Sequence, residues 1–367
     1  MEAERRFDAT ILLLAVVLTC FGVVMVYSSS SIMAAERYHD GFYFLKRQGL
    51  YALAGFGLMA VLMRMDYHLL RRLAFPGLIL CALMLLLVLV PGIGSRAGGA
   101  ARWIKFPGFS FQPSEAVKLA LIFYMAHSLA KKQDKVKSFK LGILPYMIVL
   151  SLLLLLLLLQ PDFGSAMTLA VVAMVMLMAA GTRISHLSSI VVLALPFIYY
   201  FVWHVDYRRR RIMAFLDPWQ DPTDTGFQII QSLIAFGTGG LIGNGLGEGK
   251  QKLFYLPEAH TDFIFSVVGE ELGFAGTIVI TAMFLVLVLR GIRVSLQAPD
   301  DFGRYLAFGI TLLLGMEAFL NIAVVMGMLP TKGMALPFIS YGGTSLLTSL
   351  AAIGILLSVS SRIKGEL

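Results

Sequence analysis

The chain has 367 residues, of which 58% are hydrophobic and only 14% are charged, and its formal net charge is +8. A soluble globular protein has about 45–50% apolar and about 25% charged residues, so this composition excludes a soluble enzyme. The two cysteines, Cys20 and Cys81, both lie within apolar runs, and the sequence therefore indicates no disulfide framework.

Apolar segments long enough to cross a bilayer recur along the whole chain. They lie near residues 9–28, 48–64, 73–91, 114–130, 141–159, 165–181, 187–204, 263–290, 303–328 and 343–361. We therefore expect an all-α polytopic membrane protein with about ten transmembrane helices, formed by residues 1–367 as a single domain. No small-residue cleavage site follows the first apolar run, "ATILLLAVVLTCFGVVMVY", so we expect a retained helix rather than a signal peptide.

The positions of lysine and arginine predict the orientation in the membrane. Loops rich in these residues, such as "RMDYHLLRR" and "KKQDKVKSFK", alternate with loops such as "QPDFG" that have none. Because basic loops stay on the cytoplasmic side, we expect both termini there. A large extracytoplasmic loop, residues 205–262, then separates helices 7 and 8. Its run "DYRRRR" departs from the charge rule, which long loops follow poorly.

Most of the unusual polar motifs fall on the predicted outer side. In "FQPSEAVKLA", Pro113 suits a helix start, and Glu115 and Lys118 share one helix face because they are three residues apart. This pair either stabilises the helix or places Lys118 in a polar cavity within the membrane, where ionisable residues are usually functional. In "QPDFG", we expect Asp162 to cap the next helix.

Three other features of the outer side support more than one interpretation. Trp103 fits either an interfacial anchor or a substrate contact. The arginine run 208–211 fits either attraction to anionic lipid headgroups or recognition of phosphate. An amphipathic helix is expected over 226–236. The glycine-rich turn 239–249 follows it, beside Lys250 and Lys252, and is weak evidence for phosphate binding.

The stretch "YLPEAHTDFIF" places three ionisable residues directly before a long apolar helix. Asp262, in the expected first turn, complements the helix dipole, a contribution of about 0.3–1 kcal/mol. Alternatively, partial burial and the neighbouring Glu258 raise its pKa, so that it acts as a general base. His260 is expected to cap or to make hydrogen bonds rather than to bind a metal.

Five long motifs carry a resemblance to a known family. They are "GAARWIKFPGFSFQPSEAVKLALIFYMA", "QPDFGSAM", "FLDPWQDPTDTGFQIIQSLIAFGTGGLIGNGLG", "KLFYLPEAHTDFIFSVVGEELGF" and "NIAVVMGMLPTKGMALPFISYGGTS". Together they resemble the SEDS family (shape, elongation, division and sporulation), whose members include FtsW and RodA. The likeness extends over essentially the whole chain, and "PTKG" is most similar to the division branch, FtsW. Ala335 and Thr344 depart mildly, since FtsW sequences commonly have Thr and Ser there.

The resemblance implies a peptidoglycan glycosyltransferase that joins lipid II units into glycan strands at the outer face of the cytoplasmic (inner) membrane, at the division septum. Asp262 would take the proton of the acceptor hydroxyl, with inversion, while undecaprenyl pyrophosphate leaves the donor glycan. The departing pyrophosphate needs countercharge, which either arginine and lysine side chains (Lys118, Lys332 and members of the run 208–211) or a divalent cation, Mg²⁺ or Mn²⁺ held at Asp262, would supply; no organic cofactor is expected. The residues expected to bind substrate are Arg102, Trp103, Glu115, Lys118, Arg208, Arg210, Glu258, His260, Lys332 and Ser340.

The expected partners are a class B penicillin-binding protein, which would supply the transpeptidase, and other membrane proteins of the divisome, with no nucleic acid among them. The alternatives are a RodA-like polymerase of cell elongation, a lipid II flippase and a structural scaffold. A flippase is expected to place polar residues deep in several helices, whereas here they gather at the outer end. A scaffold would need no acid at Asp262.

Overall fold

The computed structural model describes residues 7–97, 100–106, 109–224, 226–252 and 256–363. Nearly all of the regular structure in these ranges is helical, as the composition predicts. The helices are α1 (Ala9–Tyr38), α2 (Tyr43–Arg64), α3 (His68–Leu89), α4 (Pro113–Lys131), α5 (Leu144–Leu159), α6 (Phe163–Ala179), α7 (Ile184–Trp203), α8 (Asp206–Leu216), α9 (Phe227–Gly239), α10 (Ile264–Gln297), α11 (Asp301–Val325) and α12 (Gly343–Ser360). Short 3₁₀ turns (Gln133–Lys135 and Pro218–Gln220) and a π-helical turn (Phe139–Ile143) complete the set.

Local sequence determines where several of these helices begin. Asp8 caps α1 by accepting hydrogen bonds from two backbone N–H groups of the first turn, at 3.0 and 3.1 Å. Pro113 occupies the start of α4, where its missing N–H costs nothing. Asp162 caps α6 by accepting a bond from the N–H of Ser165 at 3.3 Å, which confirms the predicted cap.

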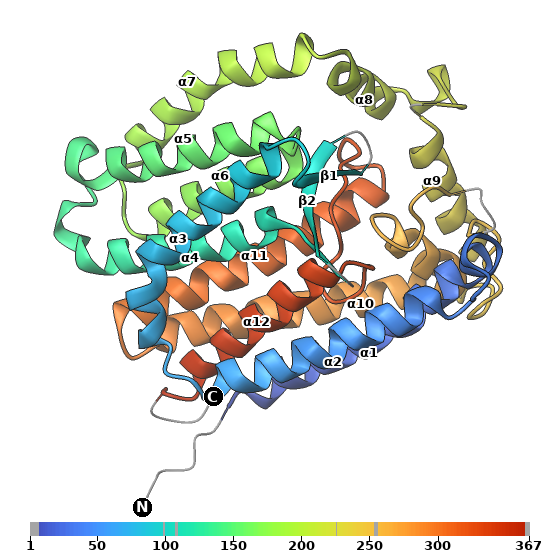
Figure 1. Ribbon diagram of the computed structural model, residues 1–367, viewed down its shortest axis with the longest axis horizontal. Coiled ribbons are helices and arrows are strands. Elements are labelled where there is room, and N and C mark those ends of the chain that lie inside the picture. The colour runs from blue at the N-terminus through green and yellow to red at the C-terminus, as the bar shows by residue number, and fades with distance from the viewer. Residues whose placement is uncertain (1–6, 98–99, 107–108, 225, 253–255, 364–367) are drawn as a thin grey trace, which may run out of the picture.

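The helices form one bundle with α11 and α12 at its middle (Figure 1). On one side, α1 packs against α10 and α2 packs against α12; on the other, α4 packs against both α3 and α11. In α11 and α12 the apolar windows are 67% and 78% buried within the protein, whereas that of α7 is only 6% buried. Figure 1 shows α7 and α8 running along the rim of the molecule, where an apolar helix such as α7 faces lipid.

Every apolar segment predicted from the sequence contains a helix. In the described part of the chain, seven helical segments are long and apolar enough to cross a membrane, and α6 is apolar but shorter. The protein is therefore a multi-pass helical membrane protein. Helices α2 and α4 occupy the two remaining predicted segments. The crossing number of about ten, the large extracytoplasmic loop and the cytoplasmic termini stay predictions.

A small sheet departs from the all-α expectation. Strands β1 (Gly94–Ala97), β2 (Ala100–Phe106) and β3 (Phe109–Phe111) pair antiparallel in the order β1-β2-β3, between α3 and α4. The sequence does not reveal this sheet, because its strands are short and interrupted by glycine and proline, which hides the strand periodicity. The Thr344 hydroxyl of α12 links it to the bundle by donating to the Ser110 carbonyl at 3.2 Å.

Two buried polar clusters join α1 to α10. In the first, which we call the Asp8 pair, the Asp8 carboxylate lies 2.9 Å from the Arg290 guanidinium. In the second, the Glu271 cluster, the Glu271 carboxylate pairs with the Lys252 ammonium at 2.6 Å and accepts a hydrogen bond from the Ser28 hydroxyl at 2.7 Å. Because each charge has a partner, these groups are accommodated inside an apolar bundle.

Candidate functional site

Asp262 lies two residues before α10, in a loop fixed by the segment that precedes α12. The Ser340 hydroxyl donates to the carbonyl of Thr261 at 2.6 Å and accepts from the N–H of Leu336 at 2.8 Å. The N–H of Tyr341 donates to the carbonyl of His260 at 2.9 Å. Ser340, expected to bind substrate, thus holds the position of the Asp262 loop in this structure.

Asn321 of α11 clamps the same two segments together from within the bundle. Its side-chain amide donates to the carbonyl of Asp262 at 2.8 Å and to the carbonyl of Met334 at 2.7 Å. Asn321 is only 2% exposed, so both bonds form away from water, where they are worth most. A Cβ atom at Gly333 would lie 3.1 Å from the Asp262 carboxylate, so glycine permits this close approach of the two loops.

The Asp262 carboxyl is partly buried beneath the surrounding loops. Burial, and secondly the negative charge of Glu258, raise the pKa of Asp262 to about 7, while Arg211 and Arg102 oppose the increase. A carboxyl with such a pKa exchanges its proton near neutral pH, which suits a general base. The predicted contribution of Glu258 is present here, although desolvation is the larger cause.

Arg102 is brought to the site by β2. Its guanidinium donates to the carbonyl of Pro161, in the turn between α5 and α6, and its charge acts on Asp262. Trp103 follows it in β2, opposite Ser95 of β1. Trp103 is partly exposed in the sheet, so its side chain is accessible to a lipid or a substrate and both predicted roles remain predictions.

The arginine run lies on α8, and its members face different ways. Arg211 donates to the carbonyl of Thr331 at 3.0 Å and is the member whose charge acts on Asp262. Arg208 lies 5.6 Å from the centre of the Phe163 ring, whereas Arg210 is exposed. A helix turns by about 100° per residue, so consecutive arginines cannot all reach one site. Sequence reasoning selected Arg208 and Arg210 and missed Arg211.

Lys332 extends the basic side of the site. Its ammonium lies 5.7 Å from the centre of the Phe163 ring and against the sulfur of Met167, so it shares the Phe163 ring with Arg208. Burial lowers the pKa of Lys332 to about 8, because the charged form is poorly solvated there. An anion placed beside Lys332 would restore the stability of its charge.

Glu258 and His260 flank Asp262 with different surroundings. The Glu258 carboxylate accepts a hydrogen bond from the Thr261 hydroxyl at 2.7 Å and is exposed. The His260 ring packs against Phe44, with ring centres 4.7 Å apart, and burial lowers its pKa. A histidine held neutral among aromatic rings fits the expected hydrogen-bonding or packing role better than a cationic one.

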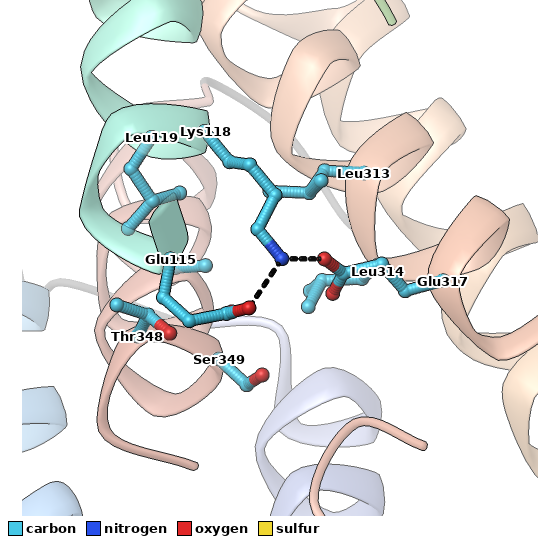
Figure 2. A pocket seen from close by; sticks show the side chains of 9 residues that line it. Glu115, Lys118, Leu119, Leu313, Leu314, Glu317, Thr348 and Ser349 are labelled. Carbon is cyan, nitrogen blue, oxygen red and sulfur yellow. Dashed lines mark hydrogen bonds and ion pairs between the residues drawn. The ribbon is translucent and has the colours of Figure 1, made fainter. Parts of the chain in front are cut away.

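Lys118 lies between two carboxylates, as Figure 2 shows. Its ammonium is 2.7 Å from the Glu115 carboxylate, which confirms the predicted helix-face pair, and it also bonds Glu317 of α11. All three groups lie inside the bundle and line a small cavity with Thr348 and Ser349 of α12. Lys118 is thus within the protein as predicted, but its charge is already matched. Glu317 was not identified, because one glutamate in an apolar helix gives no spacing signal.

The structure also bears on two further predictions, the phosphate-binding role of the glycine-rich turn and the divalent cation. Lys252, beside the glycine-rich turn, is buried against Glu271 and therefore does not offer its charge to a phosphate. The described residues contain no group of three or more His, Cys, Asp or Glu side chains that could hold a metal ion. The cation predicted at Asp262 would therefore take some of its oxygen ligands from water or substrate, as Mg²⁺ commonly does.

The fold and this site define a polytopic membrane protein with a partly buried carboxyl of raised pKa and several cations at one end of its helical bundle. Comparison with known proteins identifies the family. The chain matches, over residues 8–365, the family model for FtsW, RodA and SpoVE, described as "Cell cycle protein". Because the match covers nearly the whole chain, the protein belongs to this family, which is the SEDS family to which the sequence motifs point.

Curated relatives and solved structures agree with this assignment. A protein of Geobacter metallireducens named "Probable peptidoglycan glycosyltransferase FtsW" is 66% identical, covering 100% of this chain and 97% of its own. Stage V sporulation protein E of Bacillus subtilis is 42% identical, covering 96% of each chain. A solved structure titled "Structural coordination of polymerization and crosslinking by a peptidoglycan synthase complex" superimposes with a TM-score of 0.79 at 30% identity, covering 96% of this chain and 97% of that one.

The charges around Asp262 predict opposite effects of two variants on its titration. Glu258→Gln removes a negative neighbour and should lower the pKa of Asp262 from about 7, whereas Arg211→Gln removes a positive neighbour and should raise it. Infrared difference spectra of the carboxyl band against pH would measure both shifts, with Asp262→Asn identifying the band. Shifts of the same sign in both variants would contradict the arrangement.

Lys118, Glu115 and Glu317 form a group that we call the Lys118 triad. It predicts that two single substitutions within the group differ strongly in their effect on stability. Glu317→Gln leaves the Lys118 ammonium paired with Glu115, whereas Lys118→Met leaves two buried carboxylates without a countercharge. We expect Lys118→Met to destabilise the protein by about 3–5 kcal/mol and Glu317→Gln to cost much less. Thermal unfolding in detergent measures both effects. Equal losses in the two variants would show that the carboxylates are not held by the lysine.

Proposed function

We propose that the protein is a peptidoglycan glycosyltransferase that polymerises lipid II into glycan strands at the outer face of the cytoplasmic membrane, for septal wall synthesis in cell division. The observation that carries this proposal is the partly buried Asp262 carboxyl, which has a raised pKa, feels the charges of Arg211 and Arg102, and lies just before a membrane-spanning helix. The name of the relative from Geobacter metallireducens supports the same activity. A lipid-linked substrate keeps its tail in the bilayer and its sugars at the surface, and a loop directly before a spanning helix suits a base that must meet those sugars.

In the proposed reaction, Asp262 takes the proton of the acceptor N-acetylglucosamine 4-hydroxyl as that oxygen attacks the anomeric carbon of the donor. The new glycosidic bond forms while the bond from the anomeric carbon to undecaprenyl pyrophosphate breaks, and the configuration inverts. A pKa of about 7 leaves a substantial fraction of Asp262 ionised at neutral pH and ready to accept a proton. One base suffices, since pyrophosphate departs without full protonation. A glycosidase, by contrast, uses a carboxylate pair.

The departing pyrophosphate needs positive charge, and four cationic side chains near Asp262 are candidates to supply it. Arg102 and Arg211 act on Asp262 electrostatically, and Arg208 and Lys332 share the ring of Phe163 next to them. Preorganised cations of this kind stabilise charge that develops in the transition state. Lys118, already bound between two carboxylates, instead joins α4 to α11.

A divalent cation remains part of the proposal. Mg²⁺ usually takes one or two protein carboxylates together with waters and substrate phosphates, and Asp262 with Glu258 are the two carboxylates available here. If bound, the ion would supply charge to the pyrophosphate. Asp262 and the surrounding arginines nevertheless carry every step described above by themselves.

The proposed partners are a class B penicillin-binding protein, which cross-links the strands, and other membrane proteins of the divisome. The similarity to a chain from a solved peptidoglycan synthase complex supports this assignment. A RodA-like role in elongation differs only in the partner and the place of synthesis.

One observation favours a second candidate function, transport of lipid II. The Lys118 triad places three ionisable groups inside spanning helices, and such groups often mark a transport pathway. The other charges of the site gather at the Asp262 end, which favours surface chemistry over transport.

Polymerisation of lipid II by the purified protein, with and without a class B penicillin-binding protein, tests the proposal. We expect the wild type to make long glycan strands and Asp262→Asn to lose at least about 100-fold in rate, because the amide cannot accept the proton. Equal melting temperatures would show that the variant is folded. Polymer at wild-type rate from Asp262→Asn would remove it from the chemistry. Lipid II flipping without polymer would establish transport instead.

Asn321 should act on the reaction through Asp262. In Asn321→Leu the Asp262 loop loses its internal anchor, so the carboxyl becomes hydrated and its pKa falls from about 7. We expect kcat to drop, with the acid limb of the pH–rate profile moving to lower pH. Thr311→Val removes another buried polar group of the same helix and should leave that limb in place. A rate loss in Asn321→Leu without movement of the limb would indicate a merely structural role.

A further inference from the structure

Helix α10 is broken ten residues into its length. At Gly273 the backbone has φ 67° and ψ −165°, which are not helical angles, although the helix continues beyond it. A break in a spanning helix frees backbone N–H and C=O groups, and these must find partners because lipid offers none. Glycine meets the positive φ at no steric cost.

Residues 240–247 form a tight loop, which we call the hairpin although it contains no strands, and its backbone bonds to the groups freed at this break. The N–H groups of Phe274 and Ala275 donate to the carbonyls of Gly240 and Leu241 at 2.9 and 3.1 Å. In return, the N–H groups of 244 and 245 donate to the carbonyls of 270 and 271, both at 3.0 Å. The two backbones are in direct contact, since a Cβ atom at Gly243 would lie 2.2 Å from a carbonyl oxygen of α10.

The end of the hairpin is attached to α10 by buried carboxylates. The Glu270 carboxylate accepts a hydrogen bond from the N–H of Lys250 at 2.7 Å, and the Glu271 carboxylate pairs with Lys252. Both glutamates are buried. The hairpin is therefore bonded to α10 at both of its ends, and its position relative to the helix is fixed.

The side chains at the tip of this rigid hairpin are large and apolar. Leu241 is 74% exposed, Ile242 is 86% exposed and Leu246 is 57% exposed. They adjoin Phe274 on α10, and one turn further along lie Ile278 and its neighbours, which are also exposed on a spanning helix. The apolar tip is thus continuous with the lipid-facing surface of α10, and contiguous exposed apolar surface of this kind marks a contact site.

The two polar clusters between α1 and α10 set the depth of the hairpin. Along α1, Asp8 and Ser28 are twenty residues apart, which corresponds to about 30 Å at 1.5 Å per residue. A hydrocarbon core is also about 30 Å thick, so these clusters fit its two edges. The hairpin joins α10 at 274–275, within about one turn of Glu271 on the inward side. Its tip therefore lies at the boundary between headgroups and acyl chains.

We propose that residues 240–247 form a membrane anchor that inserts Leu241, Ile242 and Leu246 into the bilayer leaflet on the Asp262 side. The occupant of this surface is lipid, because the tip continues the lipid-facing side of α10 and carries no charged side chain between Gly240 and Gly247. Through the break at Gly273, the anchor holds the first part of α10, and Asp262 before it, at a fixed height relative to the membrane surface.

Site-directed fluorescence on the full chain in liposomes tests this placement. An environment-sensitive label is attached to Ile242→Cys, and for comparison to Glu248→Cys in the same segment, after Cys20 and Cys81 are replaced by alanine. We expect label at 242 to be quenched by doxyl groups on lipid chains and shielded from iodide. Label at 248 should show the reverse, because Glu248 is an exposed polar residue.

Two outcomes would overturn the anchor. Equal quenching by iodide at both positions would place the hairpin in water. Shielding from iodide without quenching by doxyl lipid would mean that protein, such as a second copy of the chain, covers the tip. Leu246→Cys provides an independent labelling site if Ile242→Cys does not fold. Labelling needs no catalytic activity, so a failure of the proposed reaction would leave this test unaffected.

Discussion

The desolvation of one carboxyl group is the constraint on which the rest of the site depends. Asp262 can hold a proton near neutral pH only while water is kept from it, and burial is the largest cause of its raised pKa. A loop ahead of a helix does not exclude water by itself. Hydrogen bonds from the side chains of Asn321 and Ser340 and from the N–H of Tyr341 hold this loop against the segment before α12. Arg102 and Arg211, from the sheet and from α8, then limit how far the pKa rises.

The buried ion pairs in the rest of the bundle hold particular helices together. The Lys118 triad joins α4 to α11, and the Glu271 cluster joins α1, α10 and the hairpin. In lipid there is no hydrophobic drive between apolar helices, so a few paired polar groups specify which helices meet. Replacing such a group alone leaves its partner uncompensated, which is why ionisable residues in spanning helices tolerate change poorly.

The sequence predicts the helices well, and it also singles out Asp262 as a candidate, because both depend on local patterns. Apolar length identifies the spanning segments, and the unusual placement of Asp262 before a hydrophobic helix makes it a candidate base without a structure. It does not predict Arg211 over Arg210, since the choice depends on the rotation of α8 about its axis. Glu317 and Asn321 are single polar residues in an apolar run, and their importance comes only from the loops and helices packed against them. The strands were missed because they are short and broken by glycine and proline.

The contact between Asp8 and the last helices has a consequence for the order of biosynthesis. Asp8 is fully buried, its carboxylate pairs with Arg290, and its N–H donates to the hydroxyl of Ser360 at 3.2 Å. During translation α1 emerges first, while both partners are supplied only when α10 and α12 have been made. Helices α1 and α2 therefore cannot complete their packing until α10 and α12 have been made, and a chain that ends before α12 leaves the surface of α2 that packs on α12 uncovered. Quality-control proteases would meet that surface first.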